Sequence, residues 1–383
     1  MISTFGDAFE VDPKVQIAKN TEVPFVEMAD IEPWNRTAHA KGRKKFSGGS
    51  KFLDGDVLVA RITPSLENGK TSIYKADQLD KNTPAGGSTE FIIVRGIPGK
   101  SISEFAYYLL RTADLRAHLI ANMNGSSGRQ RVQAGALRNY VVDLPSIEEQ
   151  QRIADMLGAL DDKIESNRRI AVKCDEVANI LFHQAATVNR KLDAVSEVRM
   201  GVSPPGSSYN ETGDGIAFFQ GVRDFSLLHP VARVYTNQPK RLAAAGDILF
   251  SVRAPVGRLN IADSPCCIGR GLAAITSNRS ATCLFALRAA AAEWEKFSAE
   301  GTVFGAVNQK SLKSTLIPWP DPVAEEELEY QLSSLVTLAS HSERESISLS
   351  KLRDALLPEL MSGRMRVDEA GRLVSEALNE EIY

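Results

Sequence analysis

The stretch PSIEEQQRIADMLGALDDKIESNRRIAVKCDEVANILF, residues 145–182, decides the fold that we predict for this chain. Mostly apolar or small residues recur in it at alternating steps of three and four, a spacing typical of a helix that packs against another helix. This seam runs through Leu157, Leu160, Ile164, Asn167, Ala171, Cys174, Ala178 and Leu181. A second long helical pattern covers 325–357. A long mixed segment precedes each helix, so the plan is segment, helix, segment, helix.

The second helix carries leucines spaced by seven or a multiple of seven, and we predict that its seam includes Leu335, Leu338, Leu349 and Leu352. Ser342 and Glu345 interrupt its middle, as Asn167 interrupts the first helix. These interruptions would face each other if the helices run antiparallel, and a buried Asn can set the register of such a pair. The alternative is that Asn167 lies at a solvated edge.

Composition restricts the class of protein. A chain of 383 residues with 43% hydrophobic content is long enough for two globular domains. The first residues contain no apolar signal core, and no apolar run approaches the roughly 18 residues of a membrane span, so we expect a soluble cytoplasmic protein. The four cysteines and five histidines show no metal-binding spacing, and we expect no metal. A net charge of −3 excludes a uniformly basic surface but not a local basic face.

The two mixed segments repeat each other. Residues 55–61 (GDVLVAR) match 246–253 (GDILFSVR) at a shift of 191 positions (246 − 55), and 136–145 match 311–320 at a shift of 175 (320 − 145). Between these anchors the halves differ almost completely. A duplicated frame with divergent interiors predicts two related binding modules that recognise different things.

Within these segments, turn residues and apolar runs predict several strands and helices. The predicted strands are 56–63, 89–95, 140–144, 246–253 and 315–319. The predicted helices are 286–297 and 103–122, the latter with Ser103 as its N-terminal cap. Residues 301–305 are predicted to form a loop. The long helices, at about 35 residues and ~1.5 Å per residue, would span roughly 50 Å. Because one DNA turn is roughly 34 Å, two domains at opposite ends would be able to contact one face of a duplex a turn or more apart.

Several of these stretches resemble the specificity subunit of type I restriction-modification systems. The resemblance is carried by 55–70 (GDVLVARITPSLENGK), 87–91 (GSTEF), 144–164 (LPSIEEQQRIADMLGALDDKI) and 356–364 (LLPELMSGR). It covers essentially the whole chain and includes the duplicated order of parts. One departure is that the second helix opens with DPVAEEEL, residues 321–328, and lacks the EQQRIA wording of the first.

The resemblance implies an α+β fold with two target recognition domains in tandem repeat, separated by two long helices that form an antiparallel coiled coil. The expected boundaries are 1–145 for the first domain, 146–186 for the first spacer helix, 187–322 for the second domain, 323–360 for the second spacer helix and 361–383 for a C-terminal tail. It also implies a non-catalytic subunit that reads a bipartite target in double-stranded DNA. Two adenine methyltransferase subunits and restriction or translocase subunits would dock on it and would themselves bind S-adenosylmethionine, ATP and Mg. The chain itself lacks a GxxxxGK[ST] phosphate loop and an NPPY-like motif.

For DNA contacts in the first domain we single out two groups of residues. One group directly follows a Gly-Ser loop, and the other is a short basic run. Arg and Gln side chains can read guanine and adenine edges, and neighbouring charges can hold phosphates. The alternative for both groups is a solvated loop. The candidates are Arg129, Gln130, Arg131 and Gln133 in the loop, and Lys41, Arg43, Lys44 and Lys45 in the basic run.

In the second domain the equivalent segment supplies Asn308, Gln309, Lys310 and Lys313, and Arg253 is a further candidate. On the outer face of the first helix, Glu148, Glu149, Arg152 and Arg168 are either solvated or the docking surface for the methyltransferase. Two other functions stay open at this point: an enzyme that modifies DNA by itself, and a coiled-coil scaffold with no DNA role. The DNA target and its spacer length cannot be read from these residues.

Overall fold

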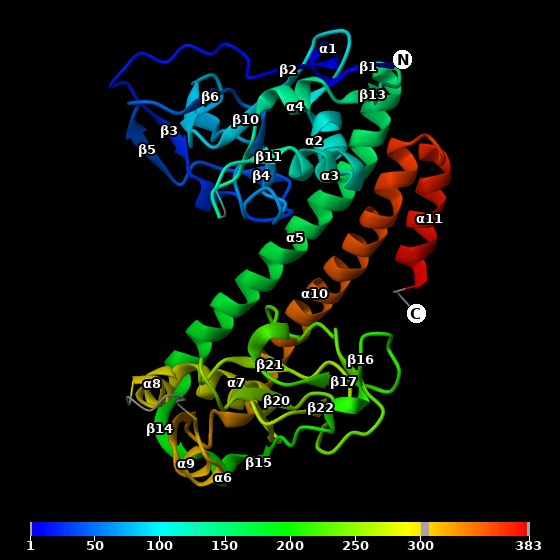
Figure 1. Ribbon diagram of the computed structural model, residues 1–383. Helices are drawn as coiled ribbons and strands as arrows, with labels where there is room; N and C mark the ends of the chain where they lie inside the picture. Colours follow the sequence, from blue (N-terminus) through cyan, green and yellow to red (C-terminus); the bar gives the residue numbers. More distant parts are fainter. Residues whose placement is uncertain (1, 127, 300–305, 381–383) are drawn as a thin grey trace. The chain divides into compact units, whose positions relative to one another are not determined.

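The computed structural model of this chain describes residues 2–126, 128–299 and 306–380. The chain splits into two compact units, a first unit of Met1–Ile164 and Ser348–Tyr383 and a second unit of Glu165–Ile347. Two long helices, α5 (Ile147–Ala185) and α10 (Glu325–Met361), contribute one part to each unit (Figure 1). The predicted loop at 301–305 lies outside the described residues.

The first unit is built on two mixed sheets, each with a parallel pair, β4 with β8 and β3 with β9. In its described part, a five-stranded sheet has the order β2-β10-β7-β8-β4 and a four-stranded sheet the order β5-β3-β9-β6. The strands of the first are β2 (Phe9–Val11), β10 (Phe91–Gly96), β7 (Val57–Ala60), β8 (Thr71–Tyr74) and β4 (Thr37–Ala38), and those of the second are β5 (Gly42–Lys45), β3 (Glu22–Val26), β9 (Ala85–Gly87) and β6 (Ser50–Phe52). Two short pairs are β1 (Ile2–Thr4) with β13 (Val141–Asp143), and β11 (Met123–Asn124) with β12 (Arg131–Val132).

Helix α2 (Ser103–Arg111) packs on the first of these sheets. The other described helices of the unit, apart from α5 and α10, are α1 (Phe5–Ala8), α3 (Ala113–Ala121), α4 (Ala134–Arg138) and α11 (Val367–Glu380). The single helix that we predicted at 103–122 is wrong, because the chain is extended at Thr112 (φ −60°, ψ 144°). The Thr112 hydroxyl donates to the carbonyl of Leu109 at 2.7 Å, in place of the N–H of Ala113 that a continuing helix would use. Ser103 is also not the cap: the N-cap is Ile102, and the Ser103 hydroxyl accepts from the N–H of Gly96.

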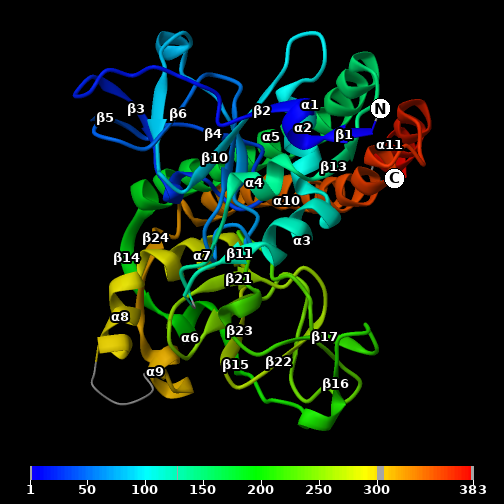
Figure 2. The same ribbon diagram turned by 45° about the horizontal axis from the view of Figure 1, so that its top comes forward.

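The second unit repeats this plan with other strands. Its four-stranded sheet comprises β15 (Glu197–Met200), β23 (Leu272–Thr276), β20 (Ile248–Ser251) and β21 (Leu259–Ile261), and its five-stranded sheet comprises β16 (Tyr209–Asn210), β18 (Tyr235–Thr236), β17 (Ile216–Phe219), β22 (Cys266–Ile268) and β19 (Leu242–Ala243). Strand β14 (Ala186–Lys191) pairs with β24 (Leu316–Pro320), on which helix α7 packs (Figure 2). The helices are α6 (Leu192–Val195), α7 (Ser280–Ala289), α8 (Ala291–Ala299) and α9 (Gln309–Ser314).

The helix predicted at 286–297 is therefore also wrong in its bounds. It begins earlier, at Ser280, and is divided into α7 and α8 at Ala290. The indole N–H of Trp294 donates to the carbonyl of Leu287 at 2.9 Å. That bond satisfies a carbonyl that the end of α7 leaves without its helical partner.

The repeated Gly-Asp pair lies directly before strand β7 in the first unit and strand β20 in the second. Gly55 (φ 87°) and Gly246 (φ 85°) adopt the left-handed turn conformation that favours glycine. The aspartate that follows each is buried: Asp56 accepts from the N–H of Leu53, and Asp247 from the N–H of Ala244, both at 2.7 Å. Each also binds an arginine from another strand of the same sheet at 2.6 Å, Arg95 of β10 for Asp56 and Arg199 of β15 for Asp247. The repeated Gly-Asp pair therefore has a structural role.

Helices α5 and α10 pack together inside each unit and run antiparallel. In the first unit Asp161 pairs with Arg353, and in the second unit Asn167 donates to Glu345 at 2.7 Å, so the numbers rise on one helix as they fall on the other. Asn167 is only 1% exposed, which excludes the solvated edge. The structure therefore confirms the prediction that the polar interruptions of the two helices face each other.

The buried stripe of α10 differs from the leucine spacing in one place. It includes Leu328, Leu332, Ala339, Ser342, Leu349, Arg353, Leu356 and Leu360, at steps of three and four or their sum. Leu338, predicted in the seam, is 48% exposed, and its neighbour Ala339 is buried instead. The choice of Leu338 was wrong because a step of four from Leu335, not three, keeps the stripe on one face here. Leu157, Leu160 and Leu349 are buried, and Ile164, Leu335 and Leu352 are partly buried against the cores.

Candidate nucleic-acid interface

The loop that follows α3 is joined to the end of β7 by backbone hydrogen bonds. The N–H of Val132 donates to the carbonyl of Arg61 at 2.9 Å, and the N–H of Thr63 donates to the carbonyl of Gln130 at 3.0 Å. Residues 129–133 therefore have a defined backbone on one side, while the Arg129 side chain is exposed. Within the described part of the chain, the Arg129 guanidinium has no hydrogen-bond or ion-pair partner, so it is available to a ligand.

Two other candidates in this loop are used within the protein. Arg131 binds the carboxylate of Glu90 through Nε and Nη2, at 2.9 and 2.7 Å. Hydrogen bonding to Glu90 raises the pKa of Arg131, so it stays charged. The amide oxygen of Gln133 accepts from Nη2 of Arg61 at 2.7 Å. Arg131 and Gln133 thus hold the loop in place, and Arg129 with Gln130 forms its outer part.

The second unit has the same construction at the equivalent positions. The N–H of Val307 donates to the carbonyl of Val252 at 2.9 Å, and Arg253 forms a bridge with Ala306 as Ile62 does with Arg131. Asn308 is the N-cap of α9, as Gln133 is of α4, and the structure therefore confirms the shift of 175 (308 − 133). Different side chains occupy one backbone frame.

The candidates of the second unit divide between held and exposed side chains. Asn308 accepts from the N–H of Ser311 at 2.9 Å, and Gln309 donates to the carbonyl of Val198 at 3.1 Å. Lys310 and Arg253 are exposed, and Lys313 is half-buried. Arg253 also lines a small pocket of about 190 Å³ with Gln220, Gly221, Val222, Ser251, Ala254 and Gly271. Exposed donors therefore border the equivalent loop here as well.

The basic run at 41–45 lies mostly on β5, at the edge of the smaller sheet of the first unit. Acidic groups face most of it: Arg43 binds Asp80 at 2.8 Å, Lys44 pairs with Glu27, and Lys41 lies 3.8 Å from Asp30. Hydrogen bonding to Asp80 raises the pKa of Arg43. Lys45 is exposed. Because these carboxylates offset much of the positive charge, this run is a weaker phosphate site than its sequence suggests.

The outer-face residues of α5 make contacts within the chain. Arg152 binds Asp368 of α11 and lies 3.2 Å from Glu149, and Arg168 lies 3.9 Å from Glu165. Glu148 is exposed at the start of the helix, where a backbone N–H lowers its pKa. The part of this face around Arg152 is therefore occupied by α11.

Sequence reasoning missed two buried groups in the helices. Gln150 is fully buried, where its amide donates to the carbonyls of Lys100 and Pro145 at 3.0 Å and ties the start of α5 to the loop before α2. Asp161, 6% exposed, accepts from the Tyr108 hydroxyl at 2.7 Å and from Arg353 at 2.6 Å. The signal available was the position of each polar residue on the apolar face of its helix.

The remaining expectations concern metals, thiols and membranes. In the described ranges, no group of three or more His, Cys, Asp or Glu residues is placed to hold a metal ion. Cys266 and Cys267 are buried free thiols on β22, and burial raises the pKa of Cys266 to about 12. None of the described helices is both long and apolar enough to cross a membrane.

Comparison with known proteins places this geometry in context. The family model described as "Type I restriction modification DNA specificity domain" matches residues 3–173 and 187–339. A protein of Methanocaldococcus jannaschii, named "Putative type I restriction enzyme MjaX specificity subunit", is 26% identical over 93% of this chain and 85% of its own length. The EcoAI specificity subunit of Escherichia coli is 30% identical over 41% of this chain and 27% of its own. The crystal structure of a type I restriction-modification S subunit from M. genitalium shares the fold, with a TM-score of 0.61 at 14% identity, over 94% of this chain and 95% of that one.

Proposed function

Since the chain belongs to the family of type I restriction modification DNA specificity domains, of which it contains two copies, we propose that it is the subunit that reads a bipartite DNA sequence. One observation carries this proposal: the loops at 129–133 and 306–310 share a backbone frame but present different side chains. A conserved frame with different Arg, Gln, Asn and Lys donors is what two domains need in order to read two different half-sites.

The proposal includes the division of labour within a larger complex. The chain itself supplies recognition and no catalysis, and two adenine methyltransferase subunits and the restriction subunits assemble on it. Those partners bind S-adenosylmethionine, ATP and Mg. The residues proposed to dock the methyltransferase, Glu148, Glu149, Arg152 and Arg168, all lie on α5.

The exposed arginine of the first loop and the exposed lysine of the second provide a matched test. We expect Arg129→Ala to weaken binding at one half-site and Lys310→Ala at the other. Each lost base contact should cost about 1–3 kcal/mol, or roughly 5- to 150-fold in affinity. The measurement is selection of bound duplexes from a random library by the full chain, followed by titration with each half-site scrambled.

Equal losses at both half-sites in either variant would contradict separate recognition. Methylation or cleavage of DNA by the purified chain alone, with S-adenosylmethionine, ATP and Mg present, would favour an enzyme instead. Absence of any duplex binding would favour a scaffold.

A further inference from the structure

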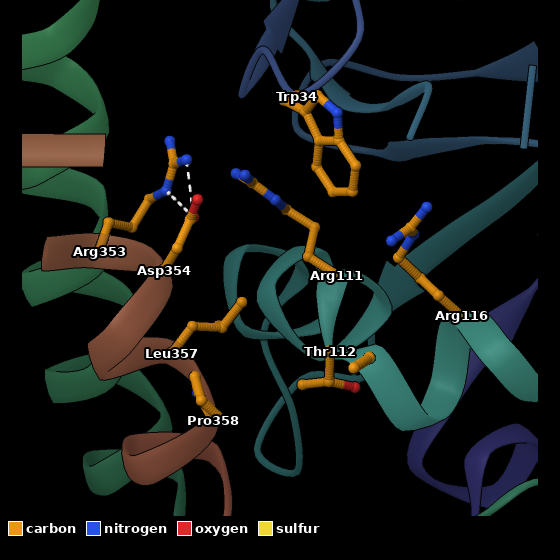
Figure 3. A pocket seen from close by; sticks show the side chains of 9 residues that line it. Trp34, Arg111, Thr112, Arg116, Arg353, Asp354, Leu357 and Pro358 are labelled. Carbon is orange, nitrogen blue, oxygen red and sulfur yellow. Dashed lines mark hydrogen bonds and ion pairs between the residues drawn. The ribbon is translucent and has the colours of Figure 1, made fainter. Parts of the chain in front are cut away.

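A pocket of the first unit combines an aromatic ring with several arginines, and its lining includes no residue of the loop at 129–133. Its volume is about 430 Å³, within the range of small-molecule sites. It is lined by Trp34, Arg111, Thr112, Ala113, Arg116, Arg353, Asp354, Leu357 and Pro358. Figure 3 shows Trp34, Arg111 and Arg116 around one space, opposite Arg353 and Asp354 of α10.

The positive charge of this pocket is not balanced by its own carboxylates. Arg353 binds both Asp161 and Asp354 and is therefore neutralised. Arg111 is 7% exposed and lies 3.7 Å from Asp161, which Arg353 and the Tyr108 hydroxyl already share. The Nε of Arg111 is buried without a hydrogen-bond partner in the described structure.

Arg116 has even less compensation. Its Nη2 donates to the carbonyl of Glu67 at 3.0 Å, and no carboxylate in the described ranges lies within ion-pair distance of it. Burial, and then the charge of Arg111, lower the pKa of Arg116. A bound anion between these two guanidinium groups would remove their mutual repulsion.

The first turn of α3 adds to the attraction for an anion. Thr112 is its N-cap, but no side-chain cap bonds the N–H groups of the first turn. Thr112 and Ala113 both line the pocket. The N-terminus of a helix with free N–H groups and a positive dipole end is a favourable place for phosphate.

On the aromatic side of the pocket, Trp34 packs against Gly69 and Arg116 but stays partly exposed. Trp34 is 41% exposed, and the Arg116 guanidinium carbon lies 4.4 Å from its ring centroid. Gly69 packs closely on the Trp34 ring, because a Cβ atom added to Gly69 would lie 2.6 Å from Cε2 of Trp34. A flat apolar group beside the anion would gain contact with Trp34, Leu357 and Pro358.

From the pocket volume, the uncompensated arginines, the start of α3 and the exposed Trp34 ring, we infer that the pocket binds a nucleotide. The phosphate would lie between Arg111, Arg116 and the start of α3, and the base would lie against Trp34. The inference goes beyond DNA reading by the loops and does not depend on it. The same chemistry is offered by a free nucleoside monophosphate and by one nucleotide of a DNA strand, and the test separates these sources.

Trp34 reports on its own pocket, because Trp294 and Trp319 are 2% and 1% exposed. Tryptophan fluorescence of the full chain is measured during titration with AMP, with adenosine, and with a short DNA duplex, and inorganic phosphate is added as a competitor. We expect saturable quenching by AMP that phosphate reverses, and at least ten-fold weaker binding of adenosine. Arg116→Gln should weaken AMP binding at least ten-fold, whereas Arg138→Gln, an exposed arginine of the same unit paired with Asp12, should leave it unchanged.

Ala113→Asp is a second variant that keeps the fold, since Ala113 is exposed and an acidic side chain suits the first turn of a helix, while it places a negative charge at the phosphate position. It should also weaken AMP binding at least ten-fold, and circular dichroism checks that both variants are folded. Quenching by the duplex but not by AMP, if it is lost in Arg116→Gln, assigns the same pocket to a nucleotide of DNA. Equal quenching by adenosine and AMP, quenching unchanged in both variants, or no saturable quenching by any probe would overturn the inference.

Discussion

At the scale of single residues, the group with the largest expected effect is the buried carboxylate of Asp161. It compensates Arg353 and lies 3.7 Å from Arg111, and all three side chains are at most 8% exposed. It also accepts from the Tyr108 hydroxyl, whose pKa is raised, first by burial and then by the charge of Asp161. Removing one partner of a buried ionic cluster costs far more than the cluster itself contributes, because a buried charge is left alone.

We therefore expect Asp161→Asn to lower the free energy of unfolding by about 3–5 kcal/mol. Its neighbour provides the control: Asp162 pairs with Arg36 at 2.6 Å but is 72% exposed, so Asp162→Asn should cost about 1 kcal/mol or less. Urea denaturation followed by circular dichroism measures both. Similar losses in the two variants would show that Asp161 does not act through buried charge.

At the scale of elements, the middle of the helix pair is polar, and this feature bears on its register. Asn167 of α5 is buried in the second unit and donates to the Glu345 carboxylate of α10 at 2.7 Å. A slip of either helix by one turn would leave both groups without this bond. The contact therefore favours one register at some cost in stability.

Replacing this asparagine should destabilise the second unit. We expect Asn167→Leu to cost about 1–3 kcal/mol, because the Glu345 carboxylate loses a donor in a half-buried site. The double variant with Glu345→Leu should be more stable than Asn167→Leu alone, since both polar groups are then gone. Arg169→Leu, a change on the same helix at a side chain 69% exposed, is the control, and thermal denaturation compares the four proteins. A double variant less stable than the single one would contradict the pairing.

At the scale of the whole molecule, two units with one frame are joined by the continuous helices α5 and α10. Under the proposed function, the length of these helices sets the spacing of the two half-sites. Inserting one heptad into α5 after Ile164 and one into α10 after Ile347 keeps the seam in phase. Seven residues add about 10.5 Å at 1.5 Å per residue, or about three base pairs at ~3.4 Å each.

The double insertion should therefore lengthen the selected spacer by about three base pairs, without changing either half-site. Selection from a random duplex library reads both properties at once. Inserting the heptad into α5 alone is the control, because α5 is then seven residues longer than α10 between the contacts Asp161–Arg353 and Asn167–Glu345, so both contacts cannot form together and thermal stability should fall. An unchanged spacer in a folded double-insertion protein would contradict the role of the helices in spacing.

Much of the frame was predictable because its signals are local or repeated. The long helix predicted from residue 145 is α5, and the strands predicted at 56–63 and 246–253 contain β7 and β20. The breaks at Thr112 and Ala290 were not predictable, since they depend on one hydroxyl and one indole that bond carbonyls of the preceding turn. The prediction that Leu338 lies in the buried seam was wrong because it followed the spacing of leucines alone, whereas the small residue Ala339 beside it takes the buried position.

The order of parts, the duplication and the family can be read from the amino-acid sequence alone, because periodicity and repeated motifs are properties of neighbouring residues. Which charges are paired becomes visible only in the folded chain. It pairs Arg131 with Glu90 and Arg43 with Asp80, and leaves Arg129 and Arg116 without a carboxylate in the described residues. It also brings Trp34, Arg116 and Arg353 around one pocket. The physical reason is that ion pairing and burial depend on distances between residues far apart in the chain, which no local pattern encodes.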